Sequence, residues 1–126
     1  MCDDRPMPTT VLVVDDHESF RRLARRLLEM AGFVVVDEAG DGASALAAVR
    51  ELRPDVVLLD VLLPDTTGIE LAEVLAADPA PPLVVLTSSR AAADLEPSLA
   101  SSSAHAFIAK RDLTAASFAA LVEDAA

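Results

Sequence analysis

Five short apolar runs recur at similar intervals along the chain. They are rich in valine and leucine and show no polar alternation, a pattern typical of strands that are covered on both faces of a parallel sheet. The runs are residues 11–14, 33–36, 56–59, 83–86 and 106–109. Segments with helical periodicity follow them. Strand and helix alternating in this way, joined by right-handed crossovers, predict an α/β fold with a doubly wound five-stranded parallel sheet.

The first helical segment carries an apolar stripe of Phe20, Leu23, Leu27 and Met30, and Gly32 supplies its stop. Four arginines fall largely off this stripe, and we interpret them as a solvated face, with kinase docking as the alternative. They are Arg21, Arg22, Arg25 and Arg26. Asp16 or His17 is expected to cap this helix, and His17 and His105 are expected on the surface.

Three further stripes predict helices. Pro54 ends the helix that follows the second run, and Pro79 ends the helix that follows the third run. The stripes are Ala45, Leu46, Val49 and Leu52; Ile69, Ala72 and Leu75; and Phe118, Leu121 and Val122, the last behind the capping candidates Asp112 and Thr114. A remaining helix over residues 91–100 contains Pro97, which predicts a kink, a late start or fraying.

Length and charge exclude several classes of protein. A chain of 126 residues is one domain, and we expect it to span residues 9–126 behind a flexible N-terminal extension, residues 1–8. A net charge of -11 argues against nucleic-acid binding. The apolar runs are far shorter than the roughly 20 residues of a membrane span, and no secretory signal is present. A single cysteine, Cys2, cannot form an internal disulfide and favours a cytoplasmic location.

Polar residues follow four of the runs, where the carboxyl ends of parallel strands meet. These residues are Asp15, Asp16, Asp60, Thr87, Ser88 and Lys110. Two carboxylates 4 Å apart repel by about 4 kcal/mol at an effective dielectric of about 20, so three of them need a cation. Mg²⁺ bound through oxygens fits this need. A phosphoryl group on one carboxylate would satisfy the metal, the ammonium and the hydroxyl together.

The motifs VLVVDDH, DVVLLDVLLPDTTG, VVLTSS and AFIAKR, in this order and spacing, resemble the receiver domains of two-component response regulators. The resemblance covers essentially the whole chain. It implies a flavodoxin-like (βα)5 fold with strand order 2-1-3-4-5. It also implies a phosphorylation-dependent signalling switch rather than a turnover enzyme.

By this resemblance, Asp60 is the phosphoacceptor, which takes the phosphoryl group from a sensor histidine kinase or a phosphotransfer protein. Mg²⁺ would be held by Asp16 directly, by Asp15 through water, by Asp60, and by the backbone carbonyl of Leu62.

The resemblance also implies roles for residues that follow the fourth and fifth runs. Thr87, Ser88 and Lys110 would bind the phosphoryl oxygens. Thr87 and Phe107 would form the switch, although Phe107 reads equally well as plain core. The output would pass through the face of the fourth helix, fifth strand and fifth helix, to a second copy of the chain or to an effector protein.

Three departures from the family pattern affect the details. Arg111 follows Lys110 where the family usually has proline, which leaves the Lys110–Arg111 peptide bond open as trans or strained cis. Leu62 and Ser89 stand two residues beyond Asp60 and Thr87, and neither side chain would activate a water. We therefore predict slow dephosphorylation.

Other functions remain as alternatives. One is a receiver-like interaction module that works without phosphorylation, and an unlikelier one is a metal-dependent phosphohydrolase with an aspartyl nucleophile. Flavin binding is disfavoured because the chain has no phosphate loop and few aromatic residues. The sequence also fits either a single-domain regulator or the receiver of a longer transcription factor.

Overall fold

The computed structural model describes residues 9–89 and 102–125 of the chain. The expected N-terminal extension, residues 1–8, and the expected helix at residues 91–100 lie outside these ranges. The elements run β1 (Thr10–Val14), α1 (Glu18–Met30), β2 (Val34–Ala39), α2 (Gly42–Leu52), β3 (Val56–Asp60), α3 (Gly68–Ala76), β4 (Leu83–Ser88), β5 (Ala106–Ala109), the short 3-10 helix η2 (Lys110–Asp112) and α5 (Ala115–Ala125).

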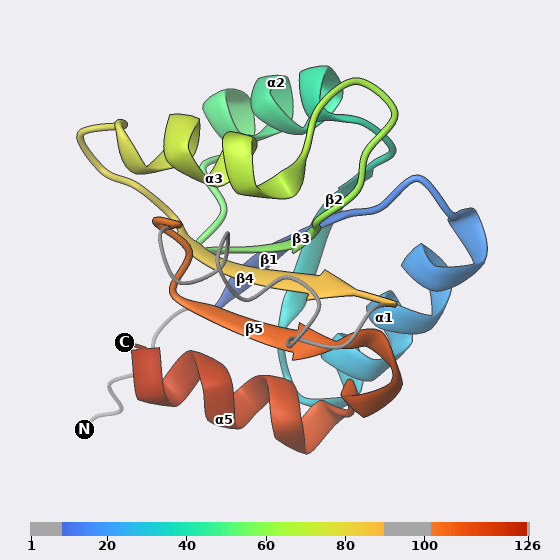
Figure 1. Cartoon of the computed structure of the whole chain (residues 1–126). Helices are drawn as coiled ribbons and strands as arrows, with labels where there is room; N and C mark the ends of the chain where they lie inside the picture. Colours follow the sequence, from blue (N-terminus) through green and yellow to red (C-terminus); the bar gives the residue numbers. More distant parts are fainter. Residues whose placement is uncertain (1–8, 90–101, 126) are drawn as a thin grey trace, which may run out of the picture.

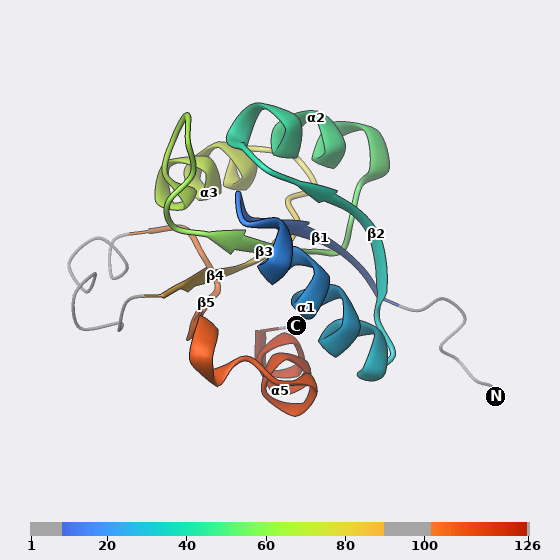
Figure 2. The same cartoon turned by 90° about the vertical axis from the view of Figure 1, so that its right-hand side faces the viewer.

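The strands form one parallel sheet in the order β2-β1-β3-β4-β5, which confirms the expected fold class and strand order. Helices α2 and α3 cover one face, and α1 and α5 cover the other (Figure 1). The view along the sheet in Figure 2 shows the same three layers. None of the helices among the described residues is long and apolar enough to cross a membrane.

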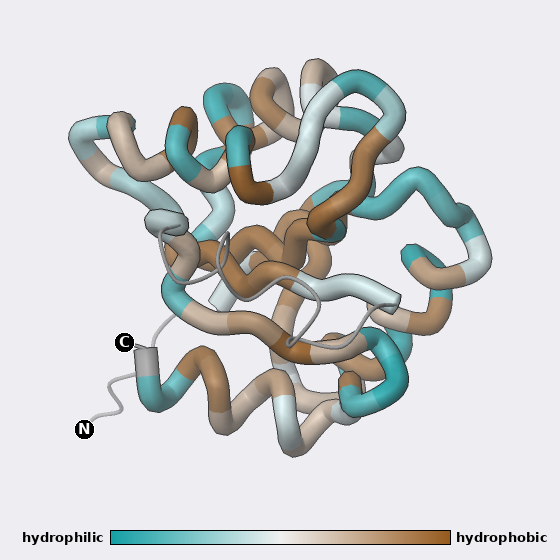
Figure 3. Tube along the Cα trace, in the orientation of Figure 1, coloured by the Kyte–Doolittle hydropathy of each residue, from teal (hydrophilic) through white to brown (hydrophobic). Residues whose placement is uncertain are grey.

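The central strands are hydrophobic on both sides because each side faces a layer of helices. In β1, Leu12 and Val14 pack toward α2 and α3, whereas Val11 and Val13 pack toward α1 and α5. The tube in Figure 3 is accordingly brown through the middle of the molecule. Burying each such side chain contributes about 1.5–3 kcal/mol, so the sheet is a rigid base for the loops at its ends.

Strand β2 is longer and more polar than predicted. It runs from Val34 to Ala39 rather than over residues 33–36, and Asp37 and Glu38 lie inside it. The pairing with β1 shifts register between Val11 and Leu12, so Leu12 pairs with Asp37. An edge strand tolerates such a bulge and such charges because one of its sides is open to solvent.

The predicted apolar face of α1 is confirmed only in part, because Phe20 and Leu27 pack against the core and the other two residues of the stripe do not. Leu23 and Met30 are 49% and 77% exposed, and Ala24 and Leu28 are the fully buried residues. The helix is rotated because two of its arginines turn inward to Glu38 of β2. Arg25 Nε donates to Glu38 at 2.7 Å, and Arg21 Nε donates at 3.2 Å. The pKa of Glu38 is lowered by these contacts, with Arg25 the larger cause.

The ends of α1 follow the prediction only in part. Gly32 ends it as predicted, with a φ of 94° that favours glycine. At the start, His17 is the N-cap residue, which confirms the expected position of the cap, but its side chain makes no capping hydrogen bond. The Asp15 carboxylate instead accepts from the backbone N–H of His17 at 2.8 Å.

The other expected caps and stripes hold with small differences. The hydroxyl of Thr114 accepts from Ser117 N–H at 3.0 Å, which confirms this cap. Asp112 contributes only its backbone carbonyl, to the Ser117 hydroxyl. In α2, Ala45 and Val49 are buried but Leu52 is 41% exposed.

Candidate functional site

The polar residues singled out in the sequence meet at the carboxyl edge of the sheet, which faces the viewer in Figure 2. Asp15 and Asp16 directly follow β1, and Asp60 is the last residue of β3. The register of β3 and β4 places Asp60 beside Thr87, and Lys110 directly follows β5. Ligand atoms of Asp15, Asp16, Asp60 and the neighbouring His17 all lie within 4.8 Å of one another.

The Asp60 carboxylate is buried and incompletely paired. Its Oδ1 accepts one long hydrogen bond from Leu62 N–H at 3.4 Å, and its Oδ2 lies 3.5 Å from Lys110 Nζ. Burial, and then the charge of Asp15, raise the pKa of Asp60 to about 6, and Lys110 opposes the rise. The folded chain therefore holds this carboxylate in a high-energy ionised state at neutral pH.

Asp15 is fully buried and held on three sides. Its backbone N–H donates to the Ala39 carbonyl at 3.0 Å, and its own carbonyl accepts from Arg21 Nη1 at 2.7 Å. Its Oδ2 lies 2.6 Å from Lys110 Nζ. The inward turn of Arg21 therefore helps to fix an acidic side chain at the end of β1.

Lys110 is the ammonium that Asp15 and Asp60 share. Its Nζ also lies 4.4 Å from the centre of the Phe20 ring of α1, in cation–π geometry. One positive charge between two buried carboxylates leaves a net negative charge in a place of low dielectric. The peptide bond that follows Lys110 is trans, as are all others in the described residues.

Thr87 and Ser88 complete the edge at the end of β4, and both are buried. Within the described part of the chain, Thr87 Oγ1 has no hydrogen-bond partner. A buried hydroxyl without a partner is costly, which points to a ligand that would accept from it.

The loop between β3 and α3 is folded back against the phosphoacceptor candidate. Gly68 N–H donates to the Val61 carbonyl at 2.7 Å. A Cβ atom on Gly68 would meet the backbone carbonyl of Asp60 closer than real Cβ atoms come, and would lie 3.0 Å from Val61 Cα. Glycine is thus required here by the close approach of two backbones.

Asp65 ties the same loop to α2. Its two carboxylate oxygens accept from the backbone N–H groups of Gly42 at 2.8 Å and Ala43 at 3.1 Å. These groups lie in the first turn of α2, where a negative charge is favoured by the helix dipole. This contact could not be predicted from the sequence, because only the fold brings residues so far apart in the chain together.

With this geometry described, the chain can be compared with known proteins. Residues 11–120 match the family described as the response regulator receiver domain. The chain belongs to this family. It is 46% identical over 91 residues to the DNA-binding response regulator MtrA of Mycolicibacterium smegmatis, an alignment that covers 71% of this chain. The chain spans only 39% of the length of that relative.

Solved receiver domains superpose on the whole fold. The signal receiver domain of the response regulator NarL from Mycobacterium tuberculosis has a TM-score of 0.82 and 33% identity, covering 95% of this chain and 98% of that one. A CheY-like receiver domain from Methylobacillus flagellatus has a TM-score of 0.83 and 26% identity, covering 95% of this chain and 100% of that one.

The receiver domain has an open pocket of about 250 Å³ at the acidic edge. It is lined by Asp16, His17, Asp60, Leu62, Leu63, Pro64, Ser88, Ser89 and Lys110. The side chains of Leu62 and Ser89 are exposed there. The pocket therefore gives a small reactant direct access to the Asp60 carboxylate.

Phe107 lies outside this pocket, one residue along β5 from the partner of Thr87. It pairs with Leu86 in the sheet register and is partly buried against the core on the α2–α3 side. A second hollow of about 190 Å³, lined by Leu86, Ser102, Ala104, His105, Ala106 and Phe107, lies beside it.

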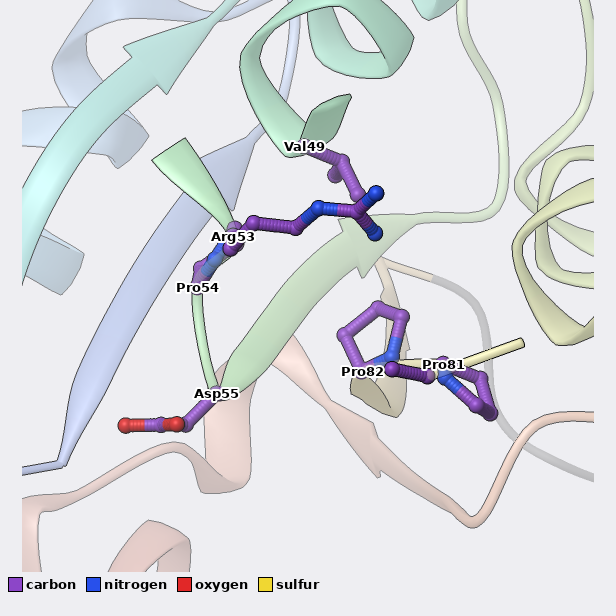
Figure 4. Close-up of a pocket in the computed structure, with 7 residues that line it drawn as sticks. Val49, Arg53, Pro54, Asp55, Pro81 and Pro82 are labelled. Carbon is purple, nitrogen blue, oxygen red and sulfur yellow. The ribbon is translucent and has the colours of Figure 1, made fainter. Parts of the chain in front are cut away.

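A pocket of about 360 Å³ lies at the opposite edge of the receiver domain, beyond the amino ends of β3 and β4. Figure 4 shows Arg53 crossing it and Asp55 pointing away from Pro81 and Pro82. Arg53 Nη1 is paired with Asp78 at 2.9 Å, and Asp55 accepts from Thr10. The two charged side chains that line this pocket are thus each paired with a residue outside it, unlike the carboxylates that share one ammonium at the acidic edge.

Three residues near the site of the receiver domain were missed or read differently from sequence. Arg21 was interpreted as solvated, Phe20 as part of the apolar stripe, and His17 as a surface residue and a candidate helix cap. The signal in the sequence is their short distance along the chain from Asp16. Residues in the first turn of a helix that directly follows β1 lie close to the carboxyl end of that strand, where the acidic residues are.

Proposed function

We propose that this chain is a signalling switch that accepts a phosphoryl group on Asp60 from the phosphohistidine of a sensor kinase or a phosphotransfer protein. The observation that carries the proposal is the buried Asp60 carboxylate, which opens on a pocket that Lys110 also lines. Beside Asp60 in the sheet, the buried Thr87 hydroxyl has no hydrogen-bond partner among the described residues. Residues 9–126 would form the switch domain.

In the proposed step, one Asp60 oxygen attacks the phosphorus. A P–O bond forms while the P–N bond of the phosphohistidine breaks, and the histidine nitrogen leaves with the bonding electrons and takes up a proton. The attacking carboxylate must be ionised, and a pKa of about 6 leaves it so at neutral pH. Its crowded, poorly solvated environment makes the anion reactive.

Lys110 and Thr87 would bind the transferred group. Lys110 Nζ already lies near both Asp15 and Asp60, so it can pair with a phosphoryl oxygen with little movement. Thr87, directly across from Asp60 in the sheet, can donate its hydroxyl to another oxygen. Ser88 is the next residue of the strand and lines the same pocket.

The residues also fit a Mg²⁺ ion. Asp15, Asp16 and Asp60 offer carboxylate oxygens within 4.8 Å of one another, and a single ammonium does not neutralise them. Asp16, Asp60 and the backbone carbonyl of Leu62 would hold the ion, with Asp15 nearby through water. Bound Mg²⁺ supplies positive charge that stabilises the phosphoryl oxygens during transfer.

Phosphorylation would act on the rest of the domain through Thr87 and Phe107. When Thr87 turns toward a phosphoryl oxygen, the space beside Leu86 and Phe107 changes, and the Phe107 ring can move into it. Phe107 has no hydroxyl, so an inward position leaves no polar group unpaired. The face that includes β5 and α5 would then bind a second copy of the chain or an effector protein.

The signal would be long-lived. Leu62 and Ser89 line the pocket at its open side, and both are exposed. An apolar side chain and a short hydroxyl cannot orient and activate a water for attack on the acyl phosphate. We expect a lifetime well above seconds.

The test is incubation of the chain with a small acyl phosphate and Mg²⁺, followed by intact mass measurement. We expect one phosphoryl group in the wild type and in Asp55→Asn, which changes the aspartate at the other end of β3, and none in Asp60→Asn. A mass gain that persists in Asp60→Asn, or its absence in the wild type, would contradict the proposal. A sizing column on the same samples reports dimerisation.

A further inference from the structure

His17 places an imidazole nitrogen between the two carboxylates that follow β1. Its Nδ1 lies 3.1 Å from Oδ1 of Asp15 and 3.1 Å from Oδ1 of Asp16. The side chain is 68% exposed, so the core does not require a ring here. It also caps nothing through its side chain among the described contacts. Its position is therefore free to serve the acidic edge.

These separations match those of ligands on one metal ion. Ligand atoms bound at about 2.1 Å in octahedral geometry lie about 3 Å from their neighbours and about 4 Å from the opposite ligand. The His17 nitrogen has this neighbour spacing to the oxygen of Asp16, the direct carboxylate ligand of the proposed site, and it also contacts Asp15 at hydrogen-bond distance. Ligand atoms of all four residues lie within 4.8 Å of one another. Little movement is needed to bring an imidazole nitrogen onto an ion held by the carboxylates.

A second observation shows that the cluster is open to a ligand. Thr87, fully buried and directly across the sheet from Asp60, carries a hydroxyl oxygen without a hydrogen-bond partner among the described residues. A buried hydroxyl next to the acidic cluster therefore lacks a hydrogen-bond acceptor among the described residues.

The chemical type of the fourth ligand decides which metal ion is bound more tightly because of it. Mg²⁺ takes oxygen ligands and keeps its waters, so a nitrogen beside it adds little. Divalent transition metals such as Co²⁺ and Zn²⁺ bind imidazole well, and a mixed set of carboxylates and imidazole is typical of their sites.

We propose that His17 is a nitrogen ligand that shifts the selectivity of this site from Mg²⁺ toward Co²⁺ and Zn²⁺. The inference rests on the metal site of the proposed function and adds a ligand to it. His17 would raise the affinity of the site for Co²⁺ or Zn²⁺, whereas Mg²⁺ would bind through the oxygens alone.

The test is calorimetric titration of the untagged chain with Mg²⁺ and with Co²⁺, in a Cys2→Ser background that removes the competing thiol. We expect His17→Ala to weaken Co²⁺ binding at least tenfold while Mg²⁺ binding changes less than threefold. The visible absorption of bound Co²⁺ should also change as nitrogen is replaced by water. His105→Ala, which removes the other histidine, is the matched control and should leave both affinities within threefold.

The outcomes separate this inference from the proposed function. If His17→Ala leaves Co²⁺ binding unchanged, or changes both ions by the same factor, His17 is no selective ligand and the inference is wrong. If that variant still gains a phosphoryl group on Asp60 with Mg²⁺, the proposed function stands. If the wild type neither binds either ion nor takes up phosphate, both proposals fail.

Discussion

Asp55 directly precedes β3 and Asp60 is its last residue, yet the surroundings of these two aspartates are opposite. Asp55, at the amino end, is exposed, and its Oδ2 accepts from the Thr10 backbone N–H at 2.9 Å and from the Thr10 hydroxyl at 3.1 Å. Asp60, at the carboxyl end, is 5% exposed and accepts one hydrogen bond of 3.4 Å. The Asp55 carboxylate is well paired with the first residue of β1, and the Asp60 carboxylate is incompletely paired.

The two ends differ because of what the connecting segments bring to them. At the amino edge, Arg53 pairs with Asp78 and Asp55 pairs with Thr10, so both of these charged groups have a partner. At the carboxyl edge, two buried carboxylates compete for one ammonium. The proposed chemistry lies at the carboxyl edge, where the pairing of charges is incomplete.

Removing the shared ammonium should have the largest effect. In metal-free buffer at pH 7.5, Lys110→Met leaves two buried carboxylates unpaired and should cost about 3 kcal/mol of unfolding free energy. Urea unfolding followed by circular dichroism measures it, since the chain has no Trp or Tyr. Arg53→Met, which breaks an exposed pair at the other edge, should cost far less. Equal losses would show that the two edges do not differ in this way.

Crowding the backbone behind Asp60 should have the next largest effect. Gly68→Ala forces a methyl group against the Asp60 carbonyl and should cost about 2 kcal/mol, as well as slowing phosphorylation, because the end of β3 must shift. Gly40→Ala is the matched control, because its Cβ would meet only Arg21 Nη1, at an ordinary 3.5 Å. The same urea experiment compares the two variants. A Gly68→Ala chain as stable and as reactive as the control would refute the steric account.

Neutralising Asp60 should stabilise the metal-free chain. Its pKa is raised to about 6 in the folded state from 3.8, so wild-type stability falls as pH rises through this window. Asp60→Asn removes this loss of stability and should raise the free energy of unfolding by about 2 kcal/mol at pH 7.5. The difference between the variant and the wild type should shrink toward pH 4. Urea unfolding at a series of pH values in the presence of EDTA tests whether the substitution raises or lowers the free energy of unfolding. Asp55→Asn should show no such gain, and a destabilised Asp60→Asn would overturn the comparison.

The smallest effect is expected at the satisfied end of the strand. Asp55→Ala removes two hydrogen bonds to Thr10 and should cost about 1 kcal/mol. It should leave the rate of phosphorylation of Asp60 unchanged, as measured by intact mass against time. A slowed rate would mean that the two ends of β3 are coupled through the strand.

Much of the fold could be predicted from the sequence because the central strands are apolar on both faces, and so read as continuous runs. The two less regular elements could not. β2 continues through Asp37 and Glu38 because it is an edge strand, and α1 is turned so that Ala24 and Leu28, not Leu23 and Met30, are buried. The periodicity of apolar residues cannot predict that two arginines of a helix turn inward to pair with a glutamate on the neighbouring strand.

For the candidate site, the sequence predicted the residue types and the strand ends at which they lie. It did not predict which groups share partners: the Lys110 ammonium between Asp15 and Asp60, the Phe20 ring beneath it, or the His17 nitrogen between two carboxylates. The assigned roles of these residues in phosphoryl transfer stay predictions until the experiments above are done.

The α/β sheet, and the acids, hydroxyls and one lysine that follow its strands, could be predicted from the order of residues alone, since hydrophobic runs and the residues that end them are local properties of the chain. Which carboxylate is well paired and which is not became visible only in the folded molecule. Burial and the separation of charges depend on how strands far apart in the chain are placed side by side, and no spacing along one chain contains those distances.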